Sequence, residues 1–257
     1  MLVINRKKMK LNKINIILLL VVGLFIVSCA KDNYDQPNAS LKGVLRDKTT
    51  GEPIPGVVGN GNFGDLQFFQ LDYGIDNPSG FSIAGFKSDG TYANATLFSG
   101  QYKLVPRGPY FYRDTVVVEL VGNMNVDLNV IPFVDVDLSL VEATSNSITV
   151  KVKAKRGEGA DEIVQQKISQ VVALLGTTAG VNYNNYYVVN NNTSDYRYVV
   201  NTSAIENEVI SVTEYTYTFK NLRANTNYYL RGASRVSNNN PSNYYNYSDV
   251  LTVKTAN

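Results

Sequence analysis

Leu41-Lys42-Gly43-Val44-Leu45-Arg46-Asp47 decides the fold, together with the residues that follow it, Lys48-Thr49-Thr50-Gly51-Glu52-Pro53-Ile54-Pro55-Gly56. The first part of this stretch predicts a short β-strand. The second part contains Gly51 and the prolines, which favour a tight turn after Asp47. A strand that ends directly in such a turn indicates a sheet of short, closely connected strands.

This stretch resembles the carboxypeptidase-regulatory-like domain, a small Greek-key β-sandwich related to transthyretin. The matching residues are Gly43, Val44, Asp47, Thr50, Gly51, Pro53, Ile54 and Gly56. The resemblance implies that these residues shape the turn and carry no chemistry.

Short strand-like segments continue to Pro132, separated by glycine, aspartate and proline. They are 65–71, 81–86, 100–106, 114–120 and 126–130, with an Asp89-Gly90 turn between the second and the third. This spacing predicts a β-sandwich over residues 40–132. Gly59-Asn60-Gly61-Asn62-Phe63-Gly64 matches the dinucleotide-binding pattern, but a β-like run follows it where that site needs a helix. We therefore interpret it as a loop between strands.

The second half of the chain also favours strands. Residues 132–140 alternate between polar and apolar, and residues 146–155 place Ile148, Val150, Val152 and Ala154 on one face. Residues 163–175 fit either one face of a helix or a buried strand, and their all-β surroundings favour the strand.

The end of the chain resembles the last strands of a fibronectin type III or Ig-like sandwich. Leu222, Thr226, Tyr228 and the run Tyr247-Ser248-Asp249-Val250-Leu251-Thr252-Val253 carry this resemblance. It implies that Leu222 and Tyr228 pack together near a tyrosine corner, and that Val250 and Val253 belong to the last strand. The predicted fold class is therefore all-β, with two tandem antiparallel β-sandwiches at 40–132 and 133–257.

The first 28 residues predict a secretory signal peptide. They contain Arg6, Lys7, Lys8, Lys10 and Lys13, no acidic residue, and an apolar run over 14–27 that is too short to span a membrane. Val27-Ser28-Cys29 resembles the bacterial lipobox, and Ala30-Lys31-Asp32 resembles the export signal of surface lipoproteins in Bacteroidetes. The resemblance implies a covalent lipid on Cys29, a tether over 29–39, and a lipid-anchored location on the outer membrane that faces the cell surface.

Composition narrows the possible functions. Five of the 24 basic residues lie in the signal peptide, whereas all 22 acidic residues lie after it, so the mature chain is acidic. This argues against nucleic acid as a partner, because nucleic-acid binding requires a basic surface. The single cysteine permits no internal disulfide, and its place at the end of the apolar run suits an anchoring role.

Catalytic and metal chemistry have little support. The chain has no histidine, so the usual Ser-His-Asp and Cys-His arrangements cannot form. A metal site would need oxygen ligands only; Asp135 with Asp137, or Asp72 with Asp76, are candidates for Ca²⁺, but no twelve-residue calcium loop is present. We therefore expect no catalytic residue, no metal and no cofactor apart from the lipid. A two-carboxylate glycosidase remains possible by residue type alone.

Tyrosine is concentrated late in the chain, with twelve of the 18 tyrosines between residues 183 and 247. Two clusters, 183–187 and 238–245, combine tyrosine with asparagine, which suits sugar binding because rings pack on C–H faces and amides bind hydroxyls. The same residues suit protein-recognition loops, or simply fill strand positions. The candidate ligand-binding residues are Tyr183, Tyr186, Tyr187, Tyr244 and Tyr245.

The order of these motifs resembles a two-domain lipoprotein family of unknown function from Bacteroidetes, encoded beside SusC/SusD-type nutrient importers. The resemblance covers nearly the whole mature chain. It implies a non-catalytic accessory lipoprotein that contacts a SusC/SusD-like importer of glycans or other nutrients. The alternatives are a stand-alone surface protein that binds oligo- or polysaccharide, and a glycan-active enzyme.

The anchor is directly testable. Cys29→Ser removes the thiol that would be acylated, so the variant should be released from the membrane fraction or remain as an unprocessed precursor. Fractionation of cells and labelling with an alkyne fatty acid measure both effects. Normal membrane retention of this variant would contradict the prediction.

Overall fold

The computed structural model describes residues 35–57, 63–72, 74, 80–111, 116–159, 167–189, 196–237 and 243–257, without the side chains of 81–84. Pro37–Asn257 form one compact unit. Cys29, most of the Gly59–Gly64 motif, Asp76 and Asn238–Ser242 lie outside the described residues, so the predictions on them stay predictions. In the described part of the chain, no helix is long and apolar enough to cross a membrane.

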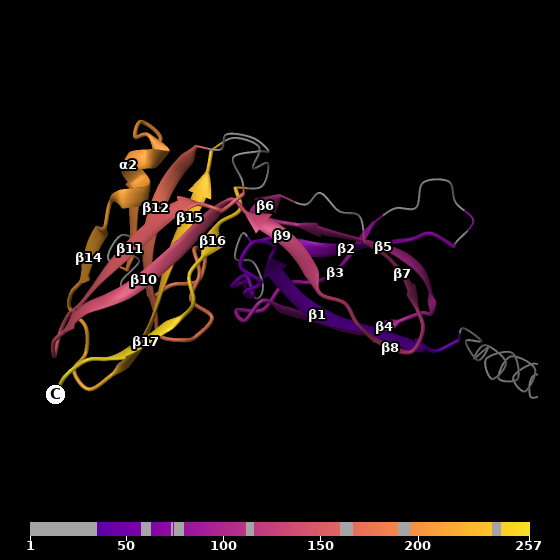
Figure 1. The fold of residues 1–257 in the computed structure, drawn as a ribbon. Coiled ribbons are helices and arrows are strands. Elements are labelled where there is room, and N and C mark those ends of the chain that lie inside the picture. The colour runs from indigo at the N-terminus through magenta and orange to yellow at the C-terminus, as the bar shows by residue number, and fades with distance from the viewer. Residues whose placement is uncertain are drawn as a thin grey trace, which may run out of the picture. The chain divides into compact units, whose positions relative to one another are not determined.

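The strands up to Pro132 form two sheets (Figure 1). One has the order β4-β1-β9-β6, with β8 beside β1, and the other has the order β3-β2-β5-β7. The bounds are β1 Ala39–Asp47, β2 Asp65–Gln70, β3 Phe81–Ala84, β4 Thr91–Leu97, β5 Gly100–Arg107, β6 Tyr110–Phe111, β7 Val116–Leu120, β8 Asn123–Asn125 and β9 Leu128–Pro132.

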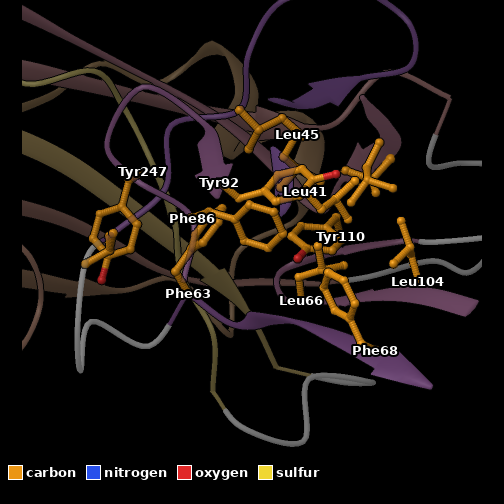
Figure 2. Packing of buried hydrophobic residues seen from close by; sticks show 14 of the residues in the cluster. Leu41, Leu45, Phe63, Leu66, Phe68, Phe86, Tyr92, Leu104, Tyr110 and Tyr247 are labelled. Carbon is orange, nitrogen blue, oxygen red and sulfur yellow. The ribbon is translucent and has the colours of Figure 1, made fainter. Parts of the chain in front are cut away.

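Alternating burial along the strands produces the core of these sheets. In β1 and β5, every second side chain is buried, which is the period expected of strands that bury one face. Gly43 is required where the chain approaches closely, because a Cβ there would lie 1.8 Å from the Val126 carbonyl oxygen. Figure 2 shows the resulting core, with Leu41, Leu45, Leu66, Phe68, Phe86, Tyr92, Leu104 and Tyr110 packed together.

The turns form as the sequence predicts. Asp47 Oδ1 accepts a hydrogen bond from Thr49 N (2.8 Å), and the backbone closes between Gly51 N and the Asp47 carbonyl oxygen. Gly90 has a φ of 76°, and the preceding Asp89 accepts hydrogen bonds from both the backbone and the hydroxyl of Thr91. These hydrogen bonds lower the pKa of Asp89. The conspicuous residues of the opening stretch thus shape backbone turns.

The strands after Phe133 form two further sheets, with the orders β10-β11-β14 and β13-β12-β15-β16; β17 also pairs with β15. Their bounds are β10 Val134–Ala143, β11 Ile148–Arg156, β12 Ile168–Gly176, β13 Arg197–Asn201, β14 Tyr215–Phe219, β15 Asn227–Val236, β16 Asn246–Tyr247 and β17 Leu251–Lys254. The predicted inward face of β11 is confirmed, because Ile148, Val150, Val152 and Ala154 are all buried.

The ambiguous segment is a strand from Ile168 to Gly176, which confirms the favoured interpretation for the described residues. Nearly every side chain of β12 is buried. Val171, Ala173 and Leu175 face the core shared with β11, whereas Val172 and Leu174 belong to the core cluster of the first sheets. A strand covered on both faces reads as a continuous apolar run, which is why its periodicity was ambiguous.

Leu222 and Tyr228 are buried in one cluster, and the Tyr228 hydroxyl accepts a hydrogen bond from Arg223 N (2.9 Å). This is the geometry of a tyrosine corner. Val253 lies in β17, and Val250 immediately precedes that strand.

Three features differ from the expectation. First, β1 pairs in parallel with β8 and β9, so the sheets are not wholly antiparallel. A parallel neighbour requires a crossover, and here β2 to β7 form that crossover. Second, a six-residue helix, α2 (Asn207–Val212), lies against β11 and buries Ile210. Third, Ala39 already belongs to β1, so the tether ends one residue earlier than predicted.

Candidate functional site

Arg231 connects the sheets before Pro132 to those after Phe133. Its side chain is only 1% exposed, its Nη2 donates to the Gly56 carbonyl oxygen (2.8 Å), and its Nε donates to the Ser248 carbonyl oxygen (2.7 Å). The guanidinium lies over the Tyr247 ring, 4.7 Å from its centroid. Burial lowers the pKa of Arg231 to about 10, so the side chain remains charged at neutral pH.

Tyr247 continues this contact into the first core. Its ring is 6.5 Å from the ring of Phe63, and Figure 2 shows the two side chains next to each other. Thr49 adds a hydrogen bond to the Glu158 carbonyl oxygen (3.1 Å), and Phe111 packs edge-on against Phe133. The junction is therefore a packed and hydrogen-bonded interface.

Beside Arg231 the junction contains a hollow of about 440 Å³, which we call the junction groove. It is lined by the turn after β1, by the first half of β10 and by the chain between β16 and β17. The lining residues are Asp47, Thr50, Glu52, Pro53, Ile54, Pro55, Pro132, Val134, Asp135, Val136, Asp137, Leu138, Lys155, Asn246, Tyr247, Ser248, Asp249, Val250 and Leu251.

The groove exists because the last strand is interrupted. β16 and β17 both pair with β15, but residues 248–250 between them leave the ladder. Ser248 keeps this segment close to β15 through its N–H, which donates to the Gly232 carbonyl oxygen, and its hydroxyl, which accepts from Gly232 N. Its carbonyl oxygen is left for Arg231. The same short segment thus forms a wall of the groove and holds the junction.

Five carboxylates outnumber the single basic residue in the described lining of the groove, which is Lys155. Burial raises the pKa of Asp135 to about 6, and the negative charges of Asp47 and Asp137 add to this rise. Lys155 opposes it, with its Nζ 3.7 Å from Asp135 Oδ2. A partly buried carboxyl group in a hollow is well suited to form hydrogen bonds with a ligand.

The described residues contain no group of three or more acidic or cysteine side chains placed to hold a metal ion. Of the aspartates considered for Ca²⁺, Asp135 and Asp137 line the groove, and Asp72 instead accepts a hydrogen bond from Gln101 N (3.2 Å). The described lining of the groove therefore offers acceptors for hydrogen bonds, and the absence of a metal stays a prediction.

The structure brings the two predicted tyrosine clusters together. The rings of Tyr183 and Tyr245 are stacked with 4.3 Å between their centroids. Tyr245 is 1% exposed, and its hydroxyl donates to Gln170 Oε1 (2.6 Å). Tyr187 packs against Tyr196 and belongs to the second core. Tyr245 and Tyr187 are therefore largely occupied by packing, and direct ligand contact by the five tyrosines stays a prediction.

The tyrosines are stacked with arginines on the outer face of the β13-β12-β15 sheet. The Arg197 guanidinium lies 4.7 Å from the Tyr183 centroid and 4.5 Å from the Tyr186 centroid. Arg235 lies 5.4 Å from the Tyr245 centroid. Sequence reasoning missed these arginines because they stand alone on strands. For Arg235 one signal was available, which is its spacing from Arg231. The two arginines are an even number of residues apart on one strand and so share a face.

Tyr244, the fifth candidate, is half-buried. It is near enough to Arg107 and Tyr110 to raise the pKa of both side chains by its charge, although Asp65 and burial, respectively, are the larger causes. It therefore lies close to the first group of sheets.

The first group of sheets matches the model of a known protein family. Residues 39–131 match the family model described as "Protein of unknown function (DUF3823) N-terminal domain". This range coincides with β1 to β9. A search of curated protein sequences found no significant match.

Solved structures resemble the whole fold. A DUF3823 family protein from Bacteroides uniformis is 19% identical, with a TM-score of 0.69 over 85% of this chain and 100% of its own. One from Parabacteroides merdae is 24% identical, with a TM-score of 0.62 over 86% and 100%. A proposed carbohydrate-binding protein from Bacteroides uniformis is 19% identical, with a TM-score of 0.66 over 85% and 99%. These structures confirm the all-β sandwich fold.

Asp135 should make the free energy of unfolding depend on pH. Because its pKa rises from 3.8 to about 6 on folding, the folded state binds more protons between these values, and stability falls as the pH rises through this window. Asp135→Asn should remove that fall, which we expect to be on the order of 1 kcal/mol after solvent screening. Urea denaturation at several pH values measures it.

Lys155→Met is the matched control. Lys155 lowers the pKa of Asp135, so its removal should extend the fall in stability to higher pH. Identical pH profiles for the wild type and Asp135→Asn would contradict the assignment.

Proposed function

We propose that this chain is a non-catalytic lipoprotein of the outer-membrane surface that binds carbohydrate in the junction groove. It would act as an accessory component of a SusC/SusD-like uptake complex. The lipid on Cys29 would hold the protein at the membrane, and the sheets from Ala39 onward would present the groove to the nutrient.

The junction groove is the observation that carries this proposal. Its volume of about 440 Å³ lies within the range of about 300–1,000 Å³ that is common for small-ligand sites. Carboxylates of Glu52, Asp137 and Asp249 can accept hydrogen bonds from sugar hydroxyls, while proline and tyrosine surfaces suit sugar C–H faces. The fold likeness to a proposed carbohydrate-binding protein supports the same ligand class.

A glycan hydrolase is the rival function, and one observation favours it. Asp135 has a raised pKa and shares the groove with other carboxyl groups, as the general acid of a glycosidase does. The geometry gives this group another explanation, because burial is the largest cause and Lys155 already pairs with it. The neighbouring Asp47 is buried and holds the turn through Thr49.

Glycan binding can be tested with one pair of matched variants. Glu52 lines the groove, whereas Glu119 is exposed on β7, away from it. Glu52→Gln should weaken binding to the recognised glycan about tenfold, because a charge-assisted hydrogen bond contributes about 1.5–3 kcal/mol. Glu119→Gln should bind as the wild type does. Affinity electrophoresis over a panel of polysaccharides, followed by calorimetry, measures this difference.

The same panel separates binding from hydrolysis. Release of reducing ends by the wild type that is lost in Asp135→Asn would establish the enzyme. Retardation on a glycan without any product supports the binding function, and no retardation on any glycan would overturn it.

The accessory role predicts a physical complex. Mild detergent extraction of crosslinked outer membranes should recover a SusC/SusD-like importer with this chain, and Cys29→Ser should abolish the recovery because the chain leaves the membrane. Glycan binding without importer recovery would favour the stand-alone surface protein.

A further inference from the structure

A row of polar side chains crosses the outer face of the β13-β12-β15 sheet. Gln170 on β12 is directly opposite Asn201 on β13 and directly opposite Arg235 on β15. Residues opposite each other on antiparallel strands point to the same face, and adjacent strands lie about 4.8 Å apart. The three side chains, which we call the donor row, therefore lie side by side next to the stacked rings of Tyr183 and Tyr245.

The acceptor atoms of this row are already partly used. Asn201 Oδ1 accepts a hydrogen bond from Ser203 N (2.9 Å), and Gln170 Oε1 accepts one from the Tyr245 hydroxyl (2.6 Å). Arg235 has no acceptor atom to offer. Each amide oxygen has one lone pair left, whereas the two amide NH₂ groups and the guanidinium supply a larger number of donors.

Arg235 is also a cation that has no counter-ion within the described part of the chain. Among the residues that the structure describes, no carboxylate pairs with it, and its buried Nε has no hydrogen-bond acceptor. Its one resolved partner is the Tyr245 ring, which holds the guanidinium plane in position. The residue as a whole is half-buried, so part of its side chain or backbone is exposed. A buried, unpaired donor is costly, and a bound anion would compensate for it.

We propose that the donor row is a second binding site, separate from the junction groove, and that it binds the carboxylate of an acidic sugar. The guanidinium of Arg235 takes the carboxylate, and the amides of Gln170 and Asn201 take ring and hydroxyl oxygens of the same sugar unit. The row spans two strand spacings, about 10 Å, which matches one sugar ring with its substituents.

The negative charge proposed for the ligand follows from the surplus of donors in the row. The choice of a sugar as the ligand rests on the proposed function. A neutral sugar brings hydroxyl groups that donate as well as accept, whereas the row offers mainly donors, because each of its two amide oxygens already accepts one hydrogen bond. A uronic acid brings two carboxylate oxygens that only accept. The junction groove has the opposite character, because its carboxylates accept and repel anions.

The test uses the full chain in detergent with calorimetry against three probes at low salt: an oligogalacturonide, a neutral oligosaccharide of the same length, and inorganic sulfate. Arg235→Gln should weaken the oligogalacturonide about tenfold or more and leave the neutral sugar unchanged. Arg223→Gln is the matched control, since Arg223 is exposed and its side chain makes no contact with the row. It should change neither affinity.

Gln170→Glu is a second variant that keeps the acceptor for Tyr245 but places a carboxylate beside Arg235. It should abolish binding of the oligogalacturonide, and circular dichroism should show a folded chain. The proposal would be overturned if the wild type does not bind the oligogalacturonide, or if a folded Arg235→Gln binds it with full affinity. Sulfate that binds as tightly as the oligogalacturonide would show a general anion site and overturn the sugar assignment.

The experiments distinguish failure of the donor-row proposal from failure of the proposed carbohydrate binding in the junction groove. Neutral-sugar binding that depends on Glu52 but not on Arg235 would retain the proposed function and remove only the donor row. If Arg235→Gln loses binding of the acidic sugar and Glu52→Gln binds every sugar as the wild type does, the donor row would be retained and binding in the junction groove removed.

Discussion

The buried guanidinium of Arg231 is the constraint on which the rest of this structure depends. Taking a charge out of water costs several kcal/mol unless hydrogen bonds replace the hydration shell. Here the replacement comes from two carbonyl oxygens, one of them on Gly56, 175 residues away in sequence, and from the face of Tyr247. These partners exist together only when the turn after β1, strand β15 and the interrupted last strand are all in place. The junction groove is a consequence of that arrangement.

The sequence predicted the parts of the fold whose signals are local. Turn residues around Asp47 and Gly90, and the alternation in β11, act over a few neighbouring residues, and the structure forms them as predicted. The parallel pairing of β1 with β8 and β9 was not predictable in the same way. It depends on the path of the whole crossover, which no local pattern encodes. The helix α2 is stabilised by burial of Ile210 against β11, a tertiary effect that no local pattern in this short stretch encodes.

The candidate sites, like the fold, could be predicted from the sequence only where local patterns indicate them. The two tyrosine clusters of the sequence meet in the structure, since the rings of Tyr183 and Tyr245 stack and pack with Val172 and Leu174 of β12. Tyrosine enrichment did not reveal that Tyr245 is buried, or that Arg197 and Arg235 stack with these rings. Nor could it reveal the groove, because Asp135 and Glu52 are more than eighty positions apart and meet only at the junction. A site built from strands of different sheets has no sequence motif.

The two polar surfaces differ because of which atoms the fold leaves unused. In the groove, carboxylates are surplus acceptors, and the pKa of Asp135 is raised mainly by burial, with the charges of Asp47 and Asp137 adding to the rise. On the outer sheet face, backbone and tyrosine donors occupy the amide oxygens of Asn201 and Gln170, which leaves a surplus of donors. Strands can hold such surpluses because their backbone groups are satisfied within the sheet, so the side chains are not needed for capping or turns. Two surfaces of opposite hydrogen-bonding character suit the proposed role in recognition, which requires no histidine, metal or reactive cysteine.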